Sequence, residues 1–300
     1  MTQDSRRRPR LALMGTRGIP ASYGGFETFA EEISSRLVQA GYDVTVYSRH
    51  APGGNKQRGV VGEVSVYSTL TIMHKYLETP LAALSGFVSL LWKRFDIILV
   101  CNAANSPFSF IPRLLGVPVV TNVDGIERER KKWNALGRLW YRLGEQTAVW
   151  FSNSIVADAR VIQDYYQLTY RCPSNVIAYG ATVNKLPPGK VLEEFGLEQG
   201  RYILYVSRLE PENNALGVIK AYVKAAIEMP LVIVGDAPYA EEYKAELREA
   251  ANDRVVFTGF QFGDAYKELR TNCYTYVQAT EVGGTHPALV EGMAYGNCVV

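Results

Sequence analysis

Short apolar runs alternate along the chain with longer stretches whose apolar residues recur three or four positions apart. The run at 11–14 is followed by a glycine-containing turn, after which Phe26, Phe29, Ile33 and Leu37 recur at helical spacing. Strands that are apolar throughout indicate a parallel sheet covered by helices on both faces, so we predict an α/β fold. Further strands are predicted at 44–47, 64–67, 96–101, 117–121, 154–157 and 175–178.

One proline- and glycine-containing stretch, at 186–189, interrupts this alternation before it restarts. We therefore predict a first domain over 1–185, a linker over 186–199 and a second domain over 200–300. Two Rossmann-like domains of this kind bind ligands at the carboxyl ends of their strands, in a cleft. We also expect a C-terminal part of the fold to be missing, because a strand begins just before Val300. Strands of the second domain are predicted at 202–206, 231–234, 254–258, 274–279 and 297–300.

Composition is that of an ordinary globular protein, with 47% hydrophobic and 21% charged residues. A net charge of +2 gives no indication of nucleic-acid binding. The four cysteines are far apart and form no C-x-x-C pair, so we expect reduced thiols in a cytoplasmic protein. No signal peptide is indicated, and the longest apolar segment, at 81–92, is too short to cross a bilayer. A peripheral position at the inner face of the cell membrane remains compatible with this.

Glycines surround the turn after the first strand. Gly15 and Gly18 enclose a Thr-Arg pair, and Gly25 begins the following helix. Such a loop lets backbone N–H groups approach a phosphate or a sugar, although the same residues also suit plain turn geometry. The pattern is not G-x-G-x-x-G, and no acidic residue ends the second strand; Arg49 there could instead bind the 2′-phosphate of NADP.

Two charged residues follow predicted strands. Asp124 comes after the strand at 117–121, where its carboxylate could orient an acceptor hydroxyl or bind the reacting sugar; the alternative is an Asp-Gly turn. Arg208 comes after the strand at 202–206 and before a helix, a place that suits a diphosphate leaving group. The alternative for Arg208 is a surface ion pair with Glu210 or Glu212.

The segment 280–296 carries the most informative pattern. Gly283 and Gly284 form a loop after a strand, Pro287 opens an apolar helix, and Glu291 lies one turn inside it. A helix start offers backbone N–H groups and a positive dipole end to an anion, while a glutamate accepts hydrogen bonds from hydroxyls. A phosphate and sugar hydroxyls together are what a nucleotide sugar presents.

No H-x-x-x-H, C-x-x-C or D-x-D spacing occurs, so we predict no metal site and expect arginine and helix dipoles to neutralise a diphosphate. The basic and aromatic stretch 127–142 has two interpretations. It could bind an anionic acceptor or a membrane interface, or it could be a solvated helix face with Glu–Lys pairs.

Five segments together resemble the retaining glycosyltransferases of family 4, which have the GT-B fold, and more narrowly the branch that includes bacterial rhamnosyltransferases of surface-polysaccharide synthesis. The resemblance covers nearly the whole chain, and its first and last segments are the most specific. It implies a nucleoside diphosphate sugar donor, with dTDP-rhamnose as the best candidate, a saccharide or lipid-linked saccharide acceptor, and no cofactor. The segments are 15–28, 122–127, 207–214, 233–236 and 282–294.

The resemblance also implies roles for individual residues. Arg208 would bind the diphosphate, and Glu291 would hold the nucleotide ribose. The backbone of Gly283, Gly284 and Thr285 would contact the donor sugar and phosphates. The loop that would approach the donor diphosphate or the acceptor contains Gly15, Arg17, Gly18 and Gly25.

The sequence departs from the wider family at three places. The lysine that usually follows the arginine by five residues is Asn213, and Arg17 could supply the absent positive charge. The glutamate usually eight residues before the ribose-binding one would fall at Gly283, and the nearest carboxylate is Glu281. Asp124 stands where the family often has a histidine.

Two other functions remain open. The Rossmann-like halves and Arg49 are compatible with an NADP-dependent oxidoreductase or epimerase. Asn213, in place of a cation, is compatible with a non-catalytic protein that binds nucleotide sugars or saccharides.

Overall fold

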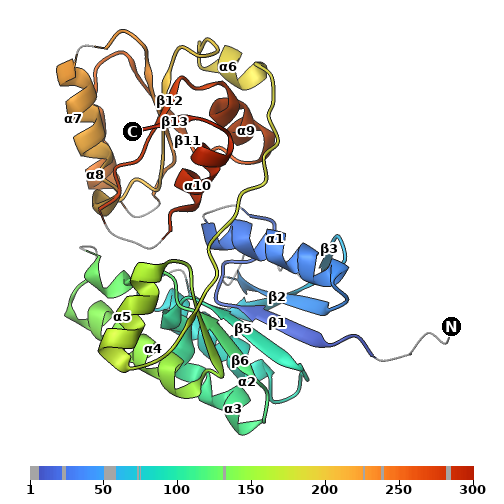
Figure 1. The fold of residues 1–300 in the computed structure, drawn as a ribbon. Helices are drawn as coiled ribbons and strands as arrows, with labels where there is room; N and C mark the ends of the chain where they lie inside the picture. The colour runs from blue at the N-terminus through green and yellow to red at the C-terminus, as the bar shows by residue number, and fades with distance from the viewer. Residues whose placement is uncertain are drawn as a thin grey trace, which may run out of the picture. The chain divides into compact units, whose positions relative to one another are not determined.

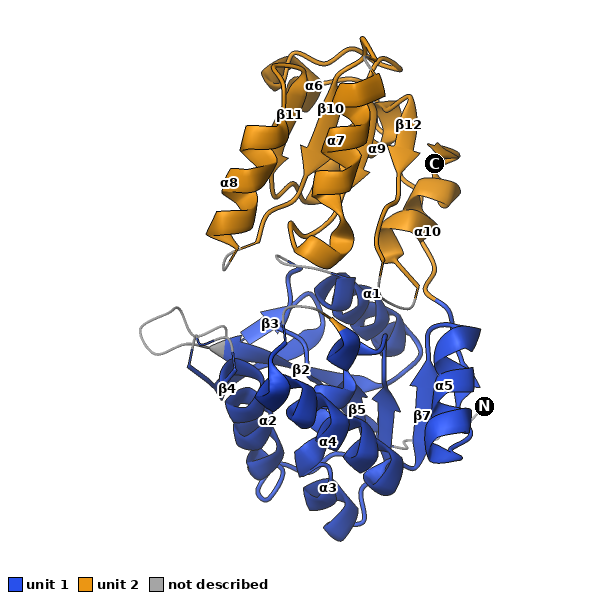
Figure 2. Cartoon of the chain, turned by 90° about the vertical axis from the view of Figure 1, so that its left-hand side faces the viewer, with its two compact units in different colours: residues 1–129, 133–178 blue, residues 130–132, 179–300 orange. Residues whose placement is uncertain are grey.

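The computed structural model describes residues 7–21, 25–50, 59–72, 74, 76–130, 133–225, 227–237, 240–281 and 285–300. The chain forms two compact units (Figure 2). Unit 1 comprises residues 1–129 and 133–178, and unit 2 comprises residues 130–132 and 179–300. Each unit is built on a largely parallel sheet with helices packed against it, as the sequence predicts (Figure 1).

Unit 1 contains, within its described residues, an eight-stranded sheet in the order β3-β4-β2-β1-β5-β6-β7-β8. Every neighbouring pair is parallel except β3 and β4. The central strand β1 pairs Leu11 with Val44 of β2 on one side and with Ile97 of β5 on the other. The strands are β1 (Arg10–Met14), β2 (Asp43–His50), β3 (Gly59–Val61), β4 (Val64–Leu70), β5 (Ile97–Cys101), β6 (Val119–Asn122), β7 (Ser154–Ala157) and β8 (Asn175–Val176).

Helices cover both faces of this sheet because successive strand residues point in opposite directions. Leu13 packs in one buried cluster with Ala30 of α1, whereas its neighbour Ala12 packs in another with Phe87 of α2. Both faces of β1 are therefore apolar, which explains its uninterrupted run of hydrophobic residues. The helical segments of unit 1 are α1 (Gly25–Gln39), α2 (Glu78–Ser89), η1 (Ala103–Phe108), α3 (Phe110–Leu114), η2 (Glu127–Glu129), α4 (Ala135–Phe151) and α5 (Arg160–Tyr170).

Unit 2 contains a five-stranded parallel sheet in the order β11-β10-β9-β12-β13. Here too the faces alternate: Tyr205 packs with Ile219 of α7, and Leu204 packs with Leu269 of α9. Its elements are α6 (Lys190–Glu194), β9 (Ile203–Val206), η3 (Pro211–Asn213), α7 (Ala215–Ala225), β10 (Leu231–Val234), α8 (Glu241–Ala250), β11 (Val255–Gly259), α9 (Gly263–Asn272), β12 (Thr275–Val277), α10 (Pro287–Ala294) and β13 (Cys298–Val299).

The segment expected to be a linker, residues 186–199, belongs to unit 2 and contains α6. Glu268 of α9 fixes the start of this helix, because its Oε1 accepts the N–H groups of Gly189 at 2.8 Å and Leu192 at 2.9 Å. A carboxylate at this position satisfies N–H groups that have no partner inside the helix. The units separate between residues 178 and 179, several residues before the predicted domain boundary.

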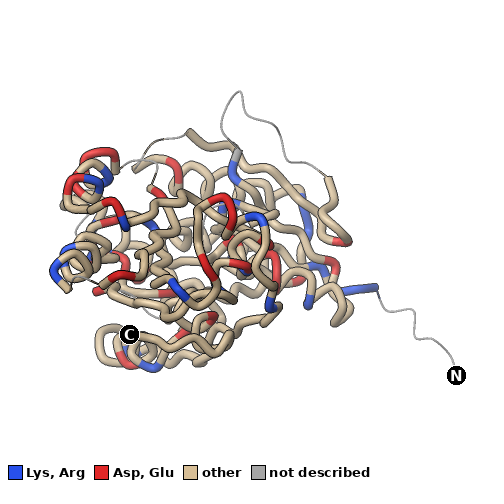
Figure 3. Tube along the Cα trace, turned by 90° about the horizontal axis from the view of Figure 1, so that it is seen from above, with Lys and Arg blue, Asp and Glu red and all other residues tan. Residues whose placement is uncertain are grey.

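Basic and acidic residues are interspersed along the trace, in keeping with the small net charge (Figure 3). None of the described helices has both the length and the apolar character needed to cross a membrane. Among the cysteines, Cys101 is buried at the end of β5, and Cys298 is exposed.

Candidate functional site

The loop after β1 lies against the ends of two neighbouring strands. Gly15 has φ +98°, and a Cβ atom there would lie 2.1 Å from the carbonyl oxygen of Cys101. Gly18 has φ +116°, and its Cβ would lie 2.2 Å from Oγ of Ser48. Both glycines are therefore required by close packing and by a backbone conformation that other residues rarely adopt. Gly25 is the first residue of α1.

One buried carboxylate binds two arginines beside this loop. Oε2 of Glu78, at the start of α2, lies 3.1 Å from Arg17, and its Oε1 lies 3.1 Å from Arg49. Arg49 also donates to the carbonyl oxygen of Gly15 at 3.3 Å, which ties the end of β2 to the loop. Glu27 of α1, also buried, accepts the backbone N–H of Arg17 at 2.9 Å. The side chain of Arg17 thus lies in an ion-pair cluster, and its predicted contact with a diphosphate stays a prediction.

Asp124 lies just beyond β6, on the same edge of the sheet. Its φ is +55°, a left-handed conformation that aspartate tolerates better than most residues. Burial raises the pKa of the Cys101 thiol, and the nearby carboxylates of Glu27 and Asp124 raise it further. The negative charge near the thiol at the end of β5 therefore comes from Glu27 on α1 and from Asp124 just beyond β6. Gly15 approaches Cys101 at the end of β5, and Asp124 follows the neighbouring strand β6, while the predicted ligand contacts of both residues stay predictions.

In unit 2, Arg208 follows β9 with a side chain 31% exposed. Its Nη2 lies 3.8 Å from Oε2 of Glu210, the longer end of the range for an ion pair. Glu210 also lies 3.4 Å from Arg130, which is grouped with unit 2. Arg208 therefore pairs with Glu210, as the alternative prediction has it, but its side chain also stays partly exposed to solvent.

Asn213 holds the backbone of the Arg208 loop. Its Nδ2 donates to the carbonyl oxygen of Arg208 at 2.7 Å, and its own carbonyl accepts the hydroxyl of Tyr205. Ser207 Oγ donates to the same tyrosine hydroxyl at 2.8 Å. The residue that replaces the expected lysine is buried and fixes the loop through neutral hydrogen bonds.

Glu291 lies in the second turn of α10, where its side chain is 23% exposed. Its Oε2 accepts the hydroxyl of Tyr266 at 2.5 Å. Thr285 lies shortly before α10, whereas Gly283 and Gly284 lie outside the described residues. The helix has proline at its first position, as predicted from Pro287.

Sequence reasoning missed the partners of these residues. Glu78 lies 61 positions from Arg17, and Tyr266 lies 25 positions from Glu291. Arg270, one turn after Tyr266 on α9, also lies near Glu291. Tyr266 and Arg270 had one signal in the sequence: an aromatic and a basic residue stand four positions apart on a predicted helix.

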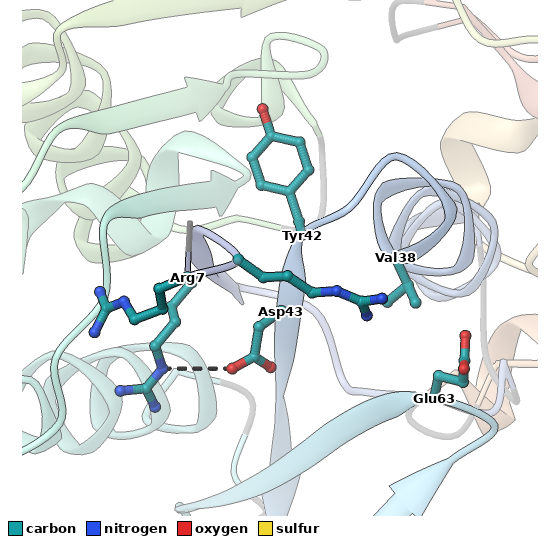
Figure 4. A pocket seen from close by; sticks show the side chains of 7 residues that line it. Arg7, Val38, Tyr42, Asp43 and Glu63 are labelled. Carbon is teal, nitrogen blue, oxygen red and sulfur yellow. Dashed lines mark ion pairs between the residues drawn. The ribbon is translucent and has the colours of Figure 1, made fainter. Parts of the chain in front are cut away.

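A surface pocket of about 470 Å³ lies at the opposite end of the strands of unit 1 (Figure 4). Arg10 and Asp43, the first residues of β1 and β2, lie 3.5 Å apart at its wall. Another arginine of the wall, Arg7, donates to both carboxylate oxygens of Asp96 at 2.8 and 2.9 Å. Because these arginines already pair with the carboxylates of Asp43 and Asp96, the pocket is a weaker candidate than the carboxyl edge, where ligands of such sheets bind. Among the described residues, no group of three or more metal-binding side chains of His, Cys, Asp or Glu occurs.

Comparison with known families identifies the chain. The profile of Glycosyltransferase Family 4 matches residues 23–180, more than half of the chain. This chain belongs to Glycosyltransferase Family 4. The profile of Glycosyl transferases group 1 matches residues 192–300 of the same family 4 protein.

One curated relative resembles part of the family 4 protein. Over 112 residues, this chain is 30% identical to N-acetylgalactosamine-N,N'-diacetylbacillosaminyl-diphospho-undecaprenol 4-alpha-N-acetylgalactosaminyltransferase of Campylobacter jejuni. The match spans 37% of this chain and 30% of that relative.

Solved structures show the same fold. Sucrose-phosphate synthase from Thermosynechococcus elongatus matches with a TM-score of 0.79 and 14% identity, over 98% of this chain and 80% of that one. Anabaena HepE, in a crystal structure with UDP and glucose, matches with a TM-score of 0.71 and 16% identity over the same shares. The predicted two-domain GT-B fold of this family 4 protein is confirmed.

The Glu78 cluster gives a prediction about stability. Glu78→Gln removes the charge that Arg17 and Arg49 share, so two partly buried guanidinium groups lose their carboxylate. We expect the free energy of unfolding to fall by about 1–3 kcal/mol. The control is Glu32→Gln, because Glu32 pairs with Arg36 on the exposed face of α1, where the loss should stay below about 0.5 kcal/mol. Urea unfolding followed by circular dichroism measures both, and equal losses would contradict the prediction.

Proposed function

We propose that this protein transfers a hexose or deoxyhexose from a nucleoside diphosphate sugar to a hydroxyl group of a saccharide or a lipid-linked saccharide. The observation that carries the proposal is the family 4 match over more than half of the chain. Unit 2 supports it with Arg208 at the end of β9 and Glu291 on α10. A guanidinium suits a diphosphate, and a carboxylate suits the hydroxyls of a ribose.

The proposed reaction retains the configuration of the sugar. The bond between the anomeric carbon and the diphosphate oxygen breaks, and a bond from that carbon to the acceptor oxygen forms on the same face. The acceptor proton passes to the departing diphosphate. Arg208 stabilises the charge that develops on this leaving group, and Asp124 orients the sugar or the acceptor hydroxyl. The chain has no D-x-D spacing, and we propose that arginine takes the place of a metal in neutralising the diphosphate.

Rhamnose is the proposed sugar and dTDP the proposed nucleotide, on the sequence resemblance described above. The Campylobacter relative is named for a diphospho-undecaprenol acceptor, which supports a lipid-linked acceptor here. The NADP-dependent alternative is not favoured, because Arg49, the residue that suggested it, binds Glu78, Thr79 and the carbonyl of Gly15.

We also propose that the protein binds a membrane surface. The residues that support this are not the whole stretch 127–142 but the exposed residues of α4. Several members of the stretch 127–142 have partners inside the protein: Arg128 donates to Tyr165, and Trp140 Nε1 donates to the carbonyl of Ala104. The exposed face of α4 carries instead a stripe of large apolar residues at helical spacing. They are Leu136, Leu139, Leu143 and Trp150.

Charge beside this stripe favours an anionic lipid surface over a neutral one. Arg138 and Arg142 are exposed one turn apart along its flank. Within α4 the one acidic residue, Glu145, is buried and accepts hydrogen bonds from Tyr165 and Tyr170. Apolar residues next to exposed arginines suit an interfacial helix that contacts acyl chains and phosphate headgroups.

The nucleotide site is tested by thermal stability of the purified protein with UDP, dTDP, GDP, ADP and NADP. A diphosphate at one hundred times its dissociation constant should add about 2.7 kcal/mol of stability. We expect one nucleoside diphosphate, dTDP if the donor is dTDP-rhamnose, to raise the melting temperature most. Stabilisation by NADP alone would reject the proposal in favour of the oxidoreductase.

Arg208→Ala tests the leaving-group role. Removing a donor that stabilises transition-state charge should lower the rate of sugar transfer about 100- to 1,000-fold. Arg201→Ala is the control, because Arg201 lies on the surface in an exposed pair with Glu198, and it should keep the wild-type rate. An unchanged rate in Arg208→Ala would show that another group carries the charge.

The membrane surface is tested with the double variant Leu139→Ser/Leu143→Ser. Sedimentation with vesicles of phosphatidylcholine and phosphatidylglycerol should show binding at least about tenfold weaker than wild type, because two apolar contacts with the acyl region are lost. Leu168→Ser on α5 replaces a leucine that is 83% exposed outside the stripe and should bind normally. Equal binding by the double variant and wild type would refute this surface.

A further inference from the structure

The guanidinium of Arg270 is wholly buried in unit 2. The residue is 0% exposed and is the largest fully buried side chain of the described residues. It lies between two aromatic rings, 5.0 Å from the ring centre of Tyr266 and 4.7 Å from that of Tyr276. Burying a charge is costly unless a partner of opposite charge compensates it.

The partner of Arg270 is Glu291. Nη2 of Arg270 donates to the hydroxyl of Tyr266, and that hydroxyl donates to Oε2 of Glu291 at 2.5 Å. Nη2 also lies 3.8 Å from the same carboxylate oxygen. Burial alone would lower the pKa of Arg270, but Tyr266 and Glu291 hold it above its ordinary value. Burial also raises the pKa of Tyr266 well above normal, so its hydroxyl keeps the proton that it donates.

Helix α10 lies close enough to the guanidinium to leave no room for a side chain. A Cβ atom on Gly292, the residue after Glu291, would lie 2.9 Å from Nη1 of Arg270 and 3.0 Å from Cδ1 of Tyr276. Among the described residues, Nε and Nη1 of Arg270 have no hydrogen-bond partner, so the hydrogen bonds described for this side chain are made by Nη2. A buried arginine used only for packing would be costly in comparison with an apolar residue of the same volume.

We propose that Arg270 and Tyr266 are positioning residues that fix the carboxylate of Glu291 for a hydroxyl of the ribose or 2′-deoxyribose of the donor nucleotide. This inference rests on the proposed function, which assigns Glu291 to the ribose. One carboxylate oxygen, Oε2, is occupied by the tyrosine hydroxyl. The other is left for the nucleotide in a fixed orientation, because Oε2 is anchored to the core of the unit. A preoriented acceptor loses less entropy on binding than a mobile one.

The experiment compares a nucleotide that has the relevant hydroxyl with one that lacks it. The probe is whichever of UDP, dTDP, GDP and ADP most stabilises the wild-type protein, together with its 2′,3′-dideoxy analogue, and calorimetry gives both dissociation constants. Wild type should prefer the natural nucleotide about tenfold or more, as expected for a hydrogen bond to a charged group. Tyr266→Phe, which removes only a hydroxyl, should reduce this preference towards one and leave the affinity for the dideoxy analogue unchanged.

Two further variants complete the test. Arg270→Met should likewise reduce the preference, because Tyr266 loses the group that orients its hydroxyl. Tyr222→Phe is the control: the hydroxyl of Tyr222 donates to the carbonyl of Met229 at 2.9 Å, away from Glu291, and this variant should keep the wild-type preference. Should Arg270→Met fail to fold, Tyr266→Phe still decides the outcome.

The possible failures are distinguishable. If wild type binds none of the four diphosphates, the proposed function fails and the inference fails with it. If wild type binds one but does not prefer it over the dideoxy analogue, or if Tyr266→Phe keeps the full preference, the inference alone is overturned. Equal weakening of both nucleotides in Tyr266→Phe would show a structural role for Tyr266 and would also overturn it.

Discussion

Parallel pairing of strands that are apolar on both faces is the constraint on which the rest of this structure depends. Parallel neighbours place their carboxyl ends on one edge, so the loops that follow β1, β5 and β6 meet although their residues are far apart in sequence. The helices needed to cover both faces begin at that same edge. Helix starts, glycine loops and polar side chains therefore gather there as a consequence of the sheet itself.

Close approach of neighbouring elements within each unit accounts for several residues that otherwise look functional. Gly15 and Gly18 leave space for the carbonyl of Cys101 and the side chain of Ser48. The side chain of Asn213 hydrogen-bonds to the backbone of Arg208, and the absence of a side chain at Gly292 lets the guanidinium of Arg270 pack against α10. These residues shape the backbone, whereas Arg208 and Glu291 keep part of their side chains in solvent. The residues that shape the backbone therefore differ from those that we propose bind the ligand.

The central strands and the longer helices could be predicted because each carries its own apolar period. β3 was missed because it is three residues long, largely exposed and antiparallel, and α6 was missed because its single turn lies beside the Pro-Pro-Gly signal that suggested a linker. Arg208, Asp124 and Glu291 could be selected as candidate residues from their places after strands or inside a helix, and their roles stay predictions. Glu78, Tyr266 and Arg270 could not, because their importance comes from tertiary contacts that no local pattern records.

The ends of the unit 1 sheet have a consequence for solubility. A long exposed edge strand offers unpaired N–H and C=O groups to another chain and promotes aggregation. Among the described residues, the outermost strands are β3, with three residues, and β8, with two. The antiparallel β3 shields the edge of the much longer β4, and neither terminal strand is long enough to template a strand from a second molecule. The sheet therefore contains eight strands but offers few unpaired backbone groups to a strand of another molecule.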